Sequence, residues 1–291
     1  MKKIVFLSLV LTLVFTFAGC ALSEDAPNEQ VYVRGEIREA IDMTEEQLAD
    51  IMNESIRNGR NIKLYDMPVH AVLVPPADDD FRLETRFFGS LTEMLLALDA
   101  GLIDGACMPE FTGKYLLARN EELQAGMFEF SNVKENYYLG FYNNSALRDQ
   151  VNEALSAMKA DGTLYALQEA YLTDLAVDPS PVTFETFDGA QTIRVAVTGD
   201  LPPIDYTAPD GSPAGFNTAL LSELGKRMKV NIEILNIESS ARTLSLTSGV
   251  ADVIFWYLYG ENYVVTDRED GIQLSDSYYR LDNWFYIEKK K

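Results

Sequence analysis

Strand and helix patterns alternate along most of this 291-residue chain. Apolar runs at 102–108, 193–197 and 252–258 are typical of buried strands, and amphipathic stretches at 145–160 and 217–229 are typical of helices. Because consecutive strands joined by helices pair side by side, the alternation predicts an α/β fold on a parallel sheet with a helix on each crossover. The length allows one or two domains of ~100–200 residues each.

A unit of helix, tight turn and strand occurs twice. Ser90 opens a helix in a capping-box pattern, and Leu98-Asp99-Ala100-Gly101-Leu102-Ile103-Asp104 leads from that helix into an apolar run. The second copy, Leu246-Thr247-Ser248-Gly249-Val250-Ala251-Asp252, follows 148 residues later. Each glycine supplies the left-handed conformation that ends a helix, and we interpret the two aspartates, Asp104 and Asp252, as turn formers. The repeat predicts two similar lobes.

The charge and the reactive side chains restrict the possible partners. Asp and Glu number 45 against 24 Lys and Arg, a formal net charge of −21. Such a surface repels phosphate backbones and anionic lipid headgroups, so we expect no nucleic acid and only a hydrophobic membrane attachment. Two cysteines, Cys20 and Cys107, and one histidine, His70, are too few for a disulfide framework or a Cys/His zinc site. We expect no metal and no cofactor, a buried Cys107 and a structural His70.

Residues 1–19 have the form of an export signal, with Lys2-Lys3 before an apolar run shorter than the ~20 residues of a bilayer span. Phe17-Ala18-Gly19-Cys20 resembles the lipobox of bacterial lipoproteins, in which the cysteine is diacylated and becomes the mature N-terminus. The small and polar residues 20–30 are typical of a tether. We therefore expect a lipid-anchored protein on the extracytoplasmic face of the cell membrane. A plain signal peptide with an incidental cysteine, or a transmembrane anchor, is the alternative.

Blocks in the last third of the chain carry a family signature. They are Ile193-Arg194-Val195-Ala196-Val197 with Pro202-Pro203-Ile204-Asp205-Tyr206 and Gly215-Phe216-Asn217, then Ser248-Gly249-Val250-Ala251-Asp252, then Leu274-Ser275-Asp276-Ser277-Tyr278-Tyr279. They resemble, in the same order, the beginning of the bacterial extracellular solute-binding proteins of family 3, the polar amino acid receptors of ABC importers. Residues 137–141 and 147–164 are similar to the last strand and the closing helices of that family.

The order of these blocks is unusual, because the ending of the family precedes its beginning. The resemblance implies a two-lobed periplasmic-binding-protein-like fold of type II, here circularly permuted, with the solute between the lobes. Permutation is tolerated where native termini lie close together. The alternative is two truncated domains that complete each other in a dimer. The expected divisions are a signal peptide at 1–19, a lipidated tether at 20–30, lobe two with the family's C-terminal helices at 31–175, a linker at 176–191 and lobe one at 192–291.

An amino acid carries a carboxylate and an ammonium group, and each needs a partner when it is desolvated. The fork of an arginine side chain pairs bidentately with a carboxylate. The resemblance implies Arg268 for this role, because Arg268 stands seven residues before Ser275, as the family's arginine does. Arg242, at the start of the second repeat's helix, is the rival candidate. For the ammonium group the resemblance implies Glu110, just past the first repeat's strand.

Aromatic residues are the candidates for contact with the rest of the solute. Tyr206 lies in the first loop of the family signature, and Phe255 and Tyr257 share one face of a strand because side chains alternate along it. Packing in the core is an equal alternative for the two strand residues. Asn217 is a further candidate, although the family has an aspartate there and the change removes a charge.

Enzyme chemistry has little support in the sequence, which lacks the common hydrolase, zinc-protease, phosphate-loop and dinucleotide patterns. We predict a receptor, not an enzyme, that captures a small polar solute, an amino acid, and presents it to an ABC permease. One alternative is a ligand-sensing module that signals to a partner protein. The other is an enzyme of the same fold, a dehydratase or a lyase.

Overall fold

The computed structural model describes residues 30–37, 62–64, 67–69, 81–173, 175, 181–238, 241–259 and 271–290. The export signal, Cys20, His70 and Arg268 lie outside these ranges. Within them, every helix is too short or too polar to span a lipid bilayer.

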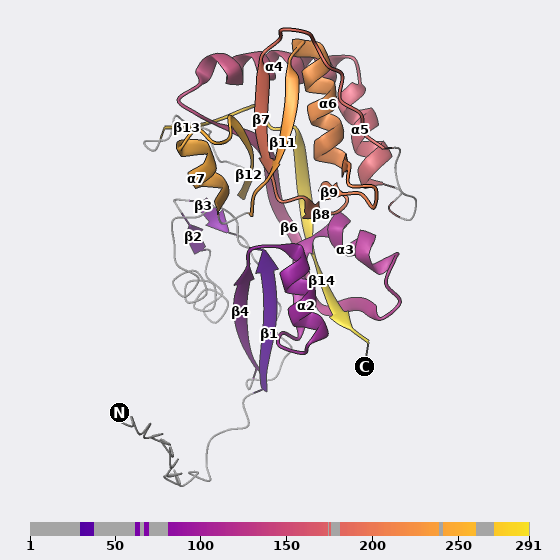
Figure 1. The fold of residues 1–291 in the computed structure, drawn as a ribbon. Helices are drawn as coiled ribbons and strands as arrows, with labels where there is room; N and C mark the ends of the chain where they lie inside the picture. Colours follow the sequence, from indigo (N-terminus) through magenta and orange to yellow (C-terminus); the bar gives the residue numbers. More distant parts are fainter. Residues whose placement is uncertain are drawn as a thin grey trace, which may run out of the picture.

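One large sheet runs through the whole molecule (Figure 1). Its strands follow the order β11-β7-β12-β6-β14-β5-β1-β4, and β13 pairs with β6 beside this path. The strands are β1 (Gln30–Ile37), β4 (Phe81–Phe88), β5 (Gly105–Pro109), β6 (Leu123–Tyr142), β7 (Thr192–Val197), β11 (Asn231–Asn236), β12 (Val253–Tyr259), β13 (Ile272–Leu274) and β14 (Tyr279–Lys289). Two small sheets hold β8 (Asp200–Leu201), β9 (Asp205–Thr207) and β10 (Pro213–Ala214), and β2 (Ile62–Leu64) and β3 (Met67–Val69).

The large sheet is mixed, which corrects the prediction of a parallel sheet. β11, β7 and β12 are parallel to one another, as are β5, β1 and β4. β6 runs antiparallel to β12 and β14, and β14 runs antiparallel to β5. β6 and β14 lie between the two parallel groups and connect them. The antiparallel pairs are therefore found where the two groups join. The alternation of elements could not reveal this, because strand periodicity is the same in parallel and antiparallel ladders.

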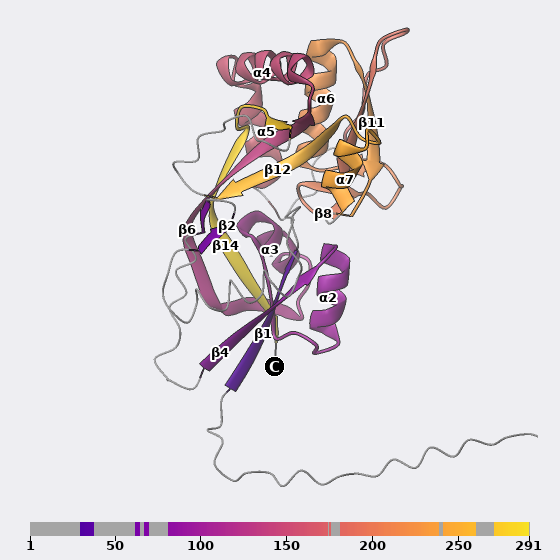
Figure 2. The ribbon, with the colours of Figure 1, turned by 90° about the vertical axis from the view of Figure 1, so that its left-hand side faces the viewer.

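Three hydrophobic clusters of the described residues define two lobes: the upper core, with a smaller cluster beside it, and the lower core (Figures 1 and 2). The upper lobe comprises β7, β11 and β12 with α4 (Ser145–Ala160), α5 (Thr163–Leu172), α6 (Phe216–Met228) and α7 (Arg242–Thr247). The lower lobe comprises β1, β4 and β5 with α2 (Leu91–Asp99). α3 (Glu110–Leu117) contributes to both cores, since Phe111 packs in the upper one and Leu116 and Leu117 against the lower one.

β6 and β14 also belong to both lobes. The upper core contains Tyr137 of β6 and Leu281 of β14, and the lower core contains Leu123 of β6 and Ile287 of β14. The sequence predicted only the stretch 137–142 of β6 and did not predict β14. The charged residues within these strands interrupt the apolar pattern, so the strands are recognisable only where they cross a core.

The repeated unit is confirmed in both lobes. Gly101 and Gly249 end their helices with φ of +70° and +75°, in the left-handed region. The Ser90 hydroxyl accepts a hydrogen bond from the Glu93 amide at 3.2 Å, as a helix cap does. Asp252 does more than form a turn, because its carboxylate is 2.8 Å from the Arg194 guanidinium on β7. The strand after Gly101 begins at Gly105 rather than residue 102, and Cys107 in it is 1% exposed.

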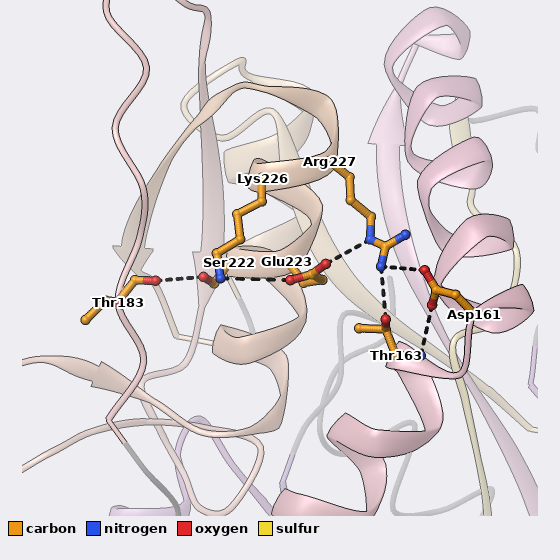
Figure 3. A network of polar contacts seen from close by, with 7 residues as sticks. All are labelled: Asp161, Thr163, Thr183, Ser222, Glu223, Lys226 and Arg227. Atoms are coloured by element: carbon orange, nitrogen blue, oxygen red, sulfur yellow. Dashed lines mark hydrogen bonds and ion pairs between the residues drawn. The ribbon is translucent and has the colours of Figure 1, made fainter.

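A polar network joins the helices before residue 175 to α6 (Figure 3). Arg227 of α6 lies 2.9 Å from both Asp161 and Glu223, and it donates to the Thr163 hydroxyl at 3.0 Å. The part of the predicted linker that is described is fixed to the same lobe, since the Ser222 hydroxyl donates to the Thr183 carbonyl at 2.7 Å. The helices of the first half of the chain and the first helix of the second half therefore form one packed unit.

Candidate functional site

Polar residues gather where the carboxyl ends of β7 and β11 meet the lower lobe. The residues after β7 form β8 and β9, and the residues after β11 lead to α7. Figure 2 shows α7 and β8 above the end of α2, on the same side of the molecule. Ligands of open α/β sheets bind outside the carboxyl ends of the strands, so this location is the candidate site.

Arg242 is the buried cation of the site. It is the first residue of α7 and is 3% exposed. Its Nε and Nη1 atoms are buried and have no hydrogen-bond partner among the described residues. The neighbouring hydroxyl of Thr243 is also buried without a partner there. Buried N–H groups are normally paired, so Arg242 offers two donors to a group that the chain itself does not supply.

Asp205 is the buried carboxylate beside it, 1% exposed. It accepts hydrogen bonds from the Thr198 hydroxyl at 2.9 Å, the Gly199 amide at 3.1 Å and the Asn217 side-chain amide at 3.1 Å. Burial raises the pKa of Asp205, and the charge of Arg242 opposes that rise. The negative charge of Asp205 thus balances the positive charge of Arg242 without a direct hydrogen bond between them. The hydrogen bonds of Asp205 come from Thr198, Gly199 and Asn217.

Asn217 holds Asp205 from within the core. It is fully buried, and its Oδ1 accepts a hydrogen bond from the Tyr278 hydroxyl at 3.1 Å. Both ends of its amide are therefore used by the protein. The position that the sequence offered as a solute contact serves to position a carboxylate.

The lobes touch directly at the site. The Thr92 amide, in the first turn of α2, donates to Asp200 Oδ2 at 2.9 Å. A second contact lies at α3, where the rings of Tyr115 and Tyr206 have centroids 6.2 Å apart. The Arg119 guanidinium lies 3.6 Å from the centroid of the Tyr115 ring. The predicted aromatic residue Tyr206 is thus at the junction of the lobes, where its ring lies at 49° to the ring of Tyr115 on α3.

Glu110 is held by its own lobe and by β14. Lys114 forms an ion pair with it, and Asn283 donates to Glu110 Oε2 at 3.0 Å. Burial alone would raise the pKa of Glu110, but the hydrogen bonds from Lys114 and Asn283 outweigh it and lower the pKa. Burial and the nearby Glu110 raise the pKa of Tyr279 to about 12. An ammonium group that reached Glu110 would therefore share its carboxylate with Lys114 and Asn283 or displace them.

The remaining candidates divide between the core and the undescribed part of the chain. Phe255 is 2% exposed and packs edge-on against Tyr278, so it is a core residue, as the alternative had it. Tyr257 lies on the described backbone of β12, opposite Tyr137, and its side chain is outside the description, as is Arg268.

The sequence reasoning missed Asp200 and Asp205 as site residues. Both lie inside the loop that carries the family signature, and each follows a short strand or a proline pair. Acidic residues at the carboxyl end of a predicted parallel strand were the signal that could have found them.

Two further features lie outside this site. A cavity of about 450 Å³ opens on the upper lobe between α4, α5 and the start of β14, lined by Lys159, Leu164, Tyr165, Gln168, Ser277, Tyr278, Tyr279 and Arg280. Over the described ranges, His, Cys, Asp and Glu side chains form no cluster of three that could hold a metal ion.

The loop after β7, the turn that holds Asp205, the helix that starts at Arg242 and the repeat's glycine all fall in one continuous stretch of the chain. Residues 193–291 match the model of the bacterial extracellular solute-binding proteins, family 3. The resemblance predicted from the sequence is confirmed for this stretch, which contains Asp200, Asp205 and Arg242. The match to family 3 begins one residue inside β7 and runs through β14 to the last residue.

Solved structures similar to this chain are distant in sequence. The ligand-binding component of an ABC-type import system from Staphylococcus aureus, with zinc bound, is 9% identical (TM-score 0.44), with 89% of this chain and 66% of that chain covered. The alkanesulfonate-binding protein SsuA from Xanthomonas axonopodis pv. citri, bound to MOPS, is 10% identical (TM-score 0.43), with 91% and 67% covered. The GluR0 ligand-binding core with L-glutamate is 7% identical (TM-score 0.40), with 89% and 85% covered. This chain thus spans about two thirds of the length of the first two. No curated protein matches the chain in sequence.

Proposed function

We propose that this protein is a solute-binding receptor that captures a small carboxylate-bearing solute, an amino acid, between its two lobes. The observation that carries the proposal is the buried guanidinium of Arg242, whose Nε and Nη1 nitrogens have no partner in the described part of the chain. Leaving these buried donors without acceptors costs free energy, and the carboxylate oxygens of a bound solute would supply charge-assisted acceptors for them. The family match of the surrounding residues supports binding rather than catalysis.

A thermal-shift screen of the twenty amino acids and simple carboxylates tests this proposal. A solute at 100 times its Kd adds about 2.7 kcal/mol to the free energy of unfolding, which raises the Tm measurably. Arg242→Met, which keeps the volume of the side chain, should abolish the shift. Arg148→Met is the matched control, because Arg148 lies on α4 and pairs with its exposed neighbour Asp149, and the change should leave the shift intact. The proposal fails if no solute shifts the Tm, or if the shift survives in Arg242→Met.

The cellular part of the proposal is a lipid anchor on Cys20 and delivery of the solute to an ABC permease. The lipobox-like residues and the family match support it. Cells grown with an alkyne-tagged fatty acid should label the wild-type protein and not Cys20→Ala. Cells that lack the protein should lose uptake of the radiolabelled solute. Unchanged uptake combined with a changed transcriptional response to the solute would instead support a sensing module.

We also propose that the chain is a circular permutation of the family 3 order. The supporting observation is the strand register in the lower lobe. Ile287 of β14 pairs with Ala106 of β5, and Arg34 of β1 pairs with Gly105. The end of β14 and the start of β1 therefore lie at the same edge of the sheet, two strand spacings or about 10 Å apart across it and offset by about three residues along it.

A relinked chain tests the permutation. It would start at residue 181, run to 290, continue through a short Gly/Ser linker to Gln30, and end at residue 175. We expect it to fold as a monomer with the far-UV circular dichroism spectrum and urea midpoint of the natural order. An obligate dimer in size exclusion with light scattering, for either chain, would contradict the proposal and support two complementing half-domains.

A further inference from the structure

The bond between Thr92 and Asp200 joins the start of α2 to β8, whose Leu201 is buried in the lower core together with Leu91. The first amides of a helix have no intrahelical acceptor, and in α2 the Ser90 hydroxyl caps the amide of Glu93. The Thr92 amide is bonded instead to Asp200 of the opposite lobe, at 2.9 Å. The partial positive charge at the start of α2 adds to the attraction for this carboxylate. A carboxylate of the upper lobe thus completes a helix end of the lower lobe.

Asp200 lies in the same loop as Asp205, the carboxylate that balances the charge of Arg242 on α7. The Gly199 amide, next to Asp200, donates to Asp205 at 3.1 Å. The other oxygen of Asp200, Oδ1, is buried without a hydrogen-bond partner in the described part of the chain. Leaving a carboxylate oxygen buried and unpaired costs free energy, so Asp200 is better solvated when the lobes part. The closed contact is therefore balanced, with one favourable bond and one unsatisfied atom.

We propose that Asp200 and the Thr92 amide form a latch that keeps the two lobes together when no solute is bound. In the latch, a carboxylate of the protein accepts from a helix-end amide. Such an amide would also suit an anionic solute. The bond at Asp200 and the burial of Leu201 in the lower core hold the latch, and the buried oxygen of Asp200 opposes it. The unliganded receptor is thus mostly closed and exchanges with an open form that admits the solute.

This inference rests on the proposed function for its meaning, since it describes regulation of that site. Its test uses the protein without solute. A failure of the latch leaves the solute screen untouched, and a failure of the screen leaves the latch measurement valid. The contact between Tyr115 and Tyr206 and the burial of Leu201 in the lower core remain in every variant below, so each variant changes only the contact at Asp200.

Amide hydrogen exchange at Thr92 is the direct measurement. No acceptor within α2 can protect this amide, so its protection reports the bond to Asp200. Asp200→Ala should speed exchange at Thr92 by roughly three- to tenfold, the value of one exposed charge-assisted bond, with little change at the capped Glu93 amide. Asp200→Asn keeps the shape and an acceptor oxygen and should give an intermediate rate. Asp276→Ala is the matched control, an exposed carboxylate of the same lobe, and should leave the rate unchanged.

Small-angle X-ray scattering completes the test. The radius of gyration of the solute-free protein should rise in Asp200→Ala and stay constant in Asp276→Ala. The removal of a buried unsatisfied oxygen should leave the Tm unchanged or higher, which shows that the variant is folded. The latch is refuted if Thr92 exchanges at the same rate in Asp200→Ala and wild type. It is also refuted if exchange accelerates while the radius of gyration does not change.

Discussion

Replacing Arg227 should show that helices from the two halves of the chain form one lobe. Arg227 lies on α6 in the second half, whereas Asp161 and Thr163 lie at the junction of α4 and α5 in the first half (Figure 3). Its side chain is 23% exposed, so solvent screens its pairs only in part. Two charge-assisted bonds and one bond to a hydroxyl at this exposure amount to about 2 kcal/mol for the Arg227→Ala change.

The loss is measurable by urea and thermal unfolding. A change of 1 kcal/mol shifts the Tm of a chain of this size by roughly 2–4 °C, so Arg227→Ala should lower the Tm by roughly 4–8 °C. Arg227→Lys keeps the charge but lacks the planar guanidinium, so its Tm should lie between those of wild type and Arg227→Ala. Arg148→Ala, which loses a pair with its exposed neighbour, should stay within about 0.5 kcal/mol of wild type. Equal losses for Arg227→Ala and Arg148→Ala would refute the reasoning.

The pH dependence gives a second readout of the same network. Hydrogen bonds from Thr163 and then Arg227 lower the pKa of Asp161 from 3.8 to about 2. A carboxyl whose pKa is lower in the folded state adds stability above its unfolded pKa and loses it as the pH falls through the folded pKa. Wild type should therefore lose this contribution between about pH 4 and pH 2. The loss over this window should be smaller in Arg227→Ala, and an unchanged loss would contradict the assignment.

Three further predictions concern the loop and the core. Gly215 has φ of +107°, and a Cβ there would lie 2.3 Å from a backbone carbonyl oxygen, so Gly215→Ala should cost at least ~3 kcal/mol by urea unfolding. The control Gly211→Ala, with φ of +85° and open space around it, should cost only ~1 kcal/mol. Asn217→Asp would bury a second carboxylate against Asp205 and raise the pKa values of both, so stability should be lost at pH 7 and recovered as the pH falls to about 4.5; a variant as stable as wild type at pH 7 would contradict this. Cys107, 1% exposed, should react with a thiol reagent only at the rate of unfolding, and rapid labelling of the native protein would show the core to be open.

The local elements were predictable because they follow local rules. The repeated unit at Gly101 and Gly249 depends on a left-handed residue at a helix end, and the capping serine Ser90 depends on a spacing of three. Both features can be recognised from a few neighbouring residues in the sequence. The strand directions were not, because the pairing of β6 with β12 and β14 joins residues far apart in sequence and both kinds of ladder share one periodicity.

The site was predictable in part for a related reason. Arg242 was a candidate because it begins a repeated helix, but its burial follows from packing of the lobe and has no signature in the sequence. Asn217 and Phe255 stood at positions that match the family or share a strand face, and the fold uses both inside the upper lobe. Asp200 gained its contact from the other lobe, which only the assembled structure can bring near.

The ladder between β6 and β14 determines how one lobe can move relative to the other. The pairing of these strands shifts register between Leu281 and Asn283 and again between Phe285 and Ile287, between the parts of β14 that lie in the upper and lower cores. Irregular pairing weakens the ladder and increases its local twist and bend. Flexure is therefore concentrated in a few residues of β14, while the paired backbones restrain sliding and swivelling. The lobes should therefore open by a hinge rotation about one axis, which is set by these few residues of β14.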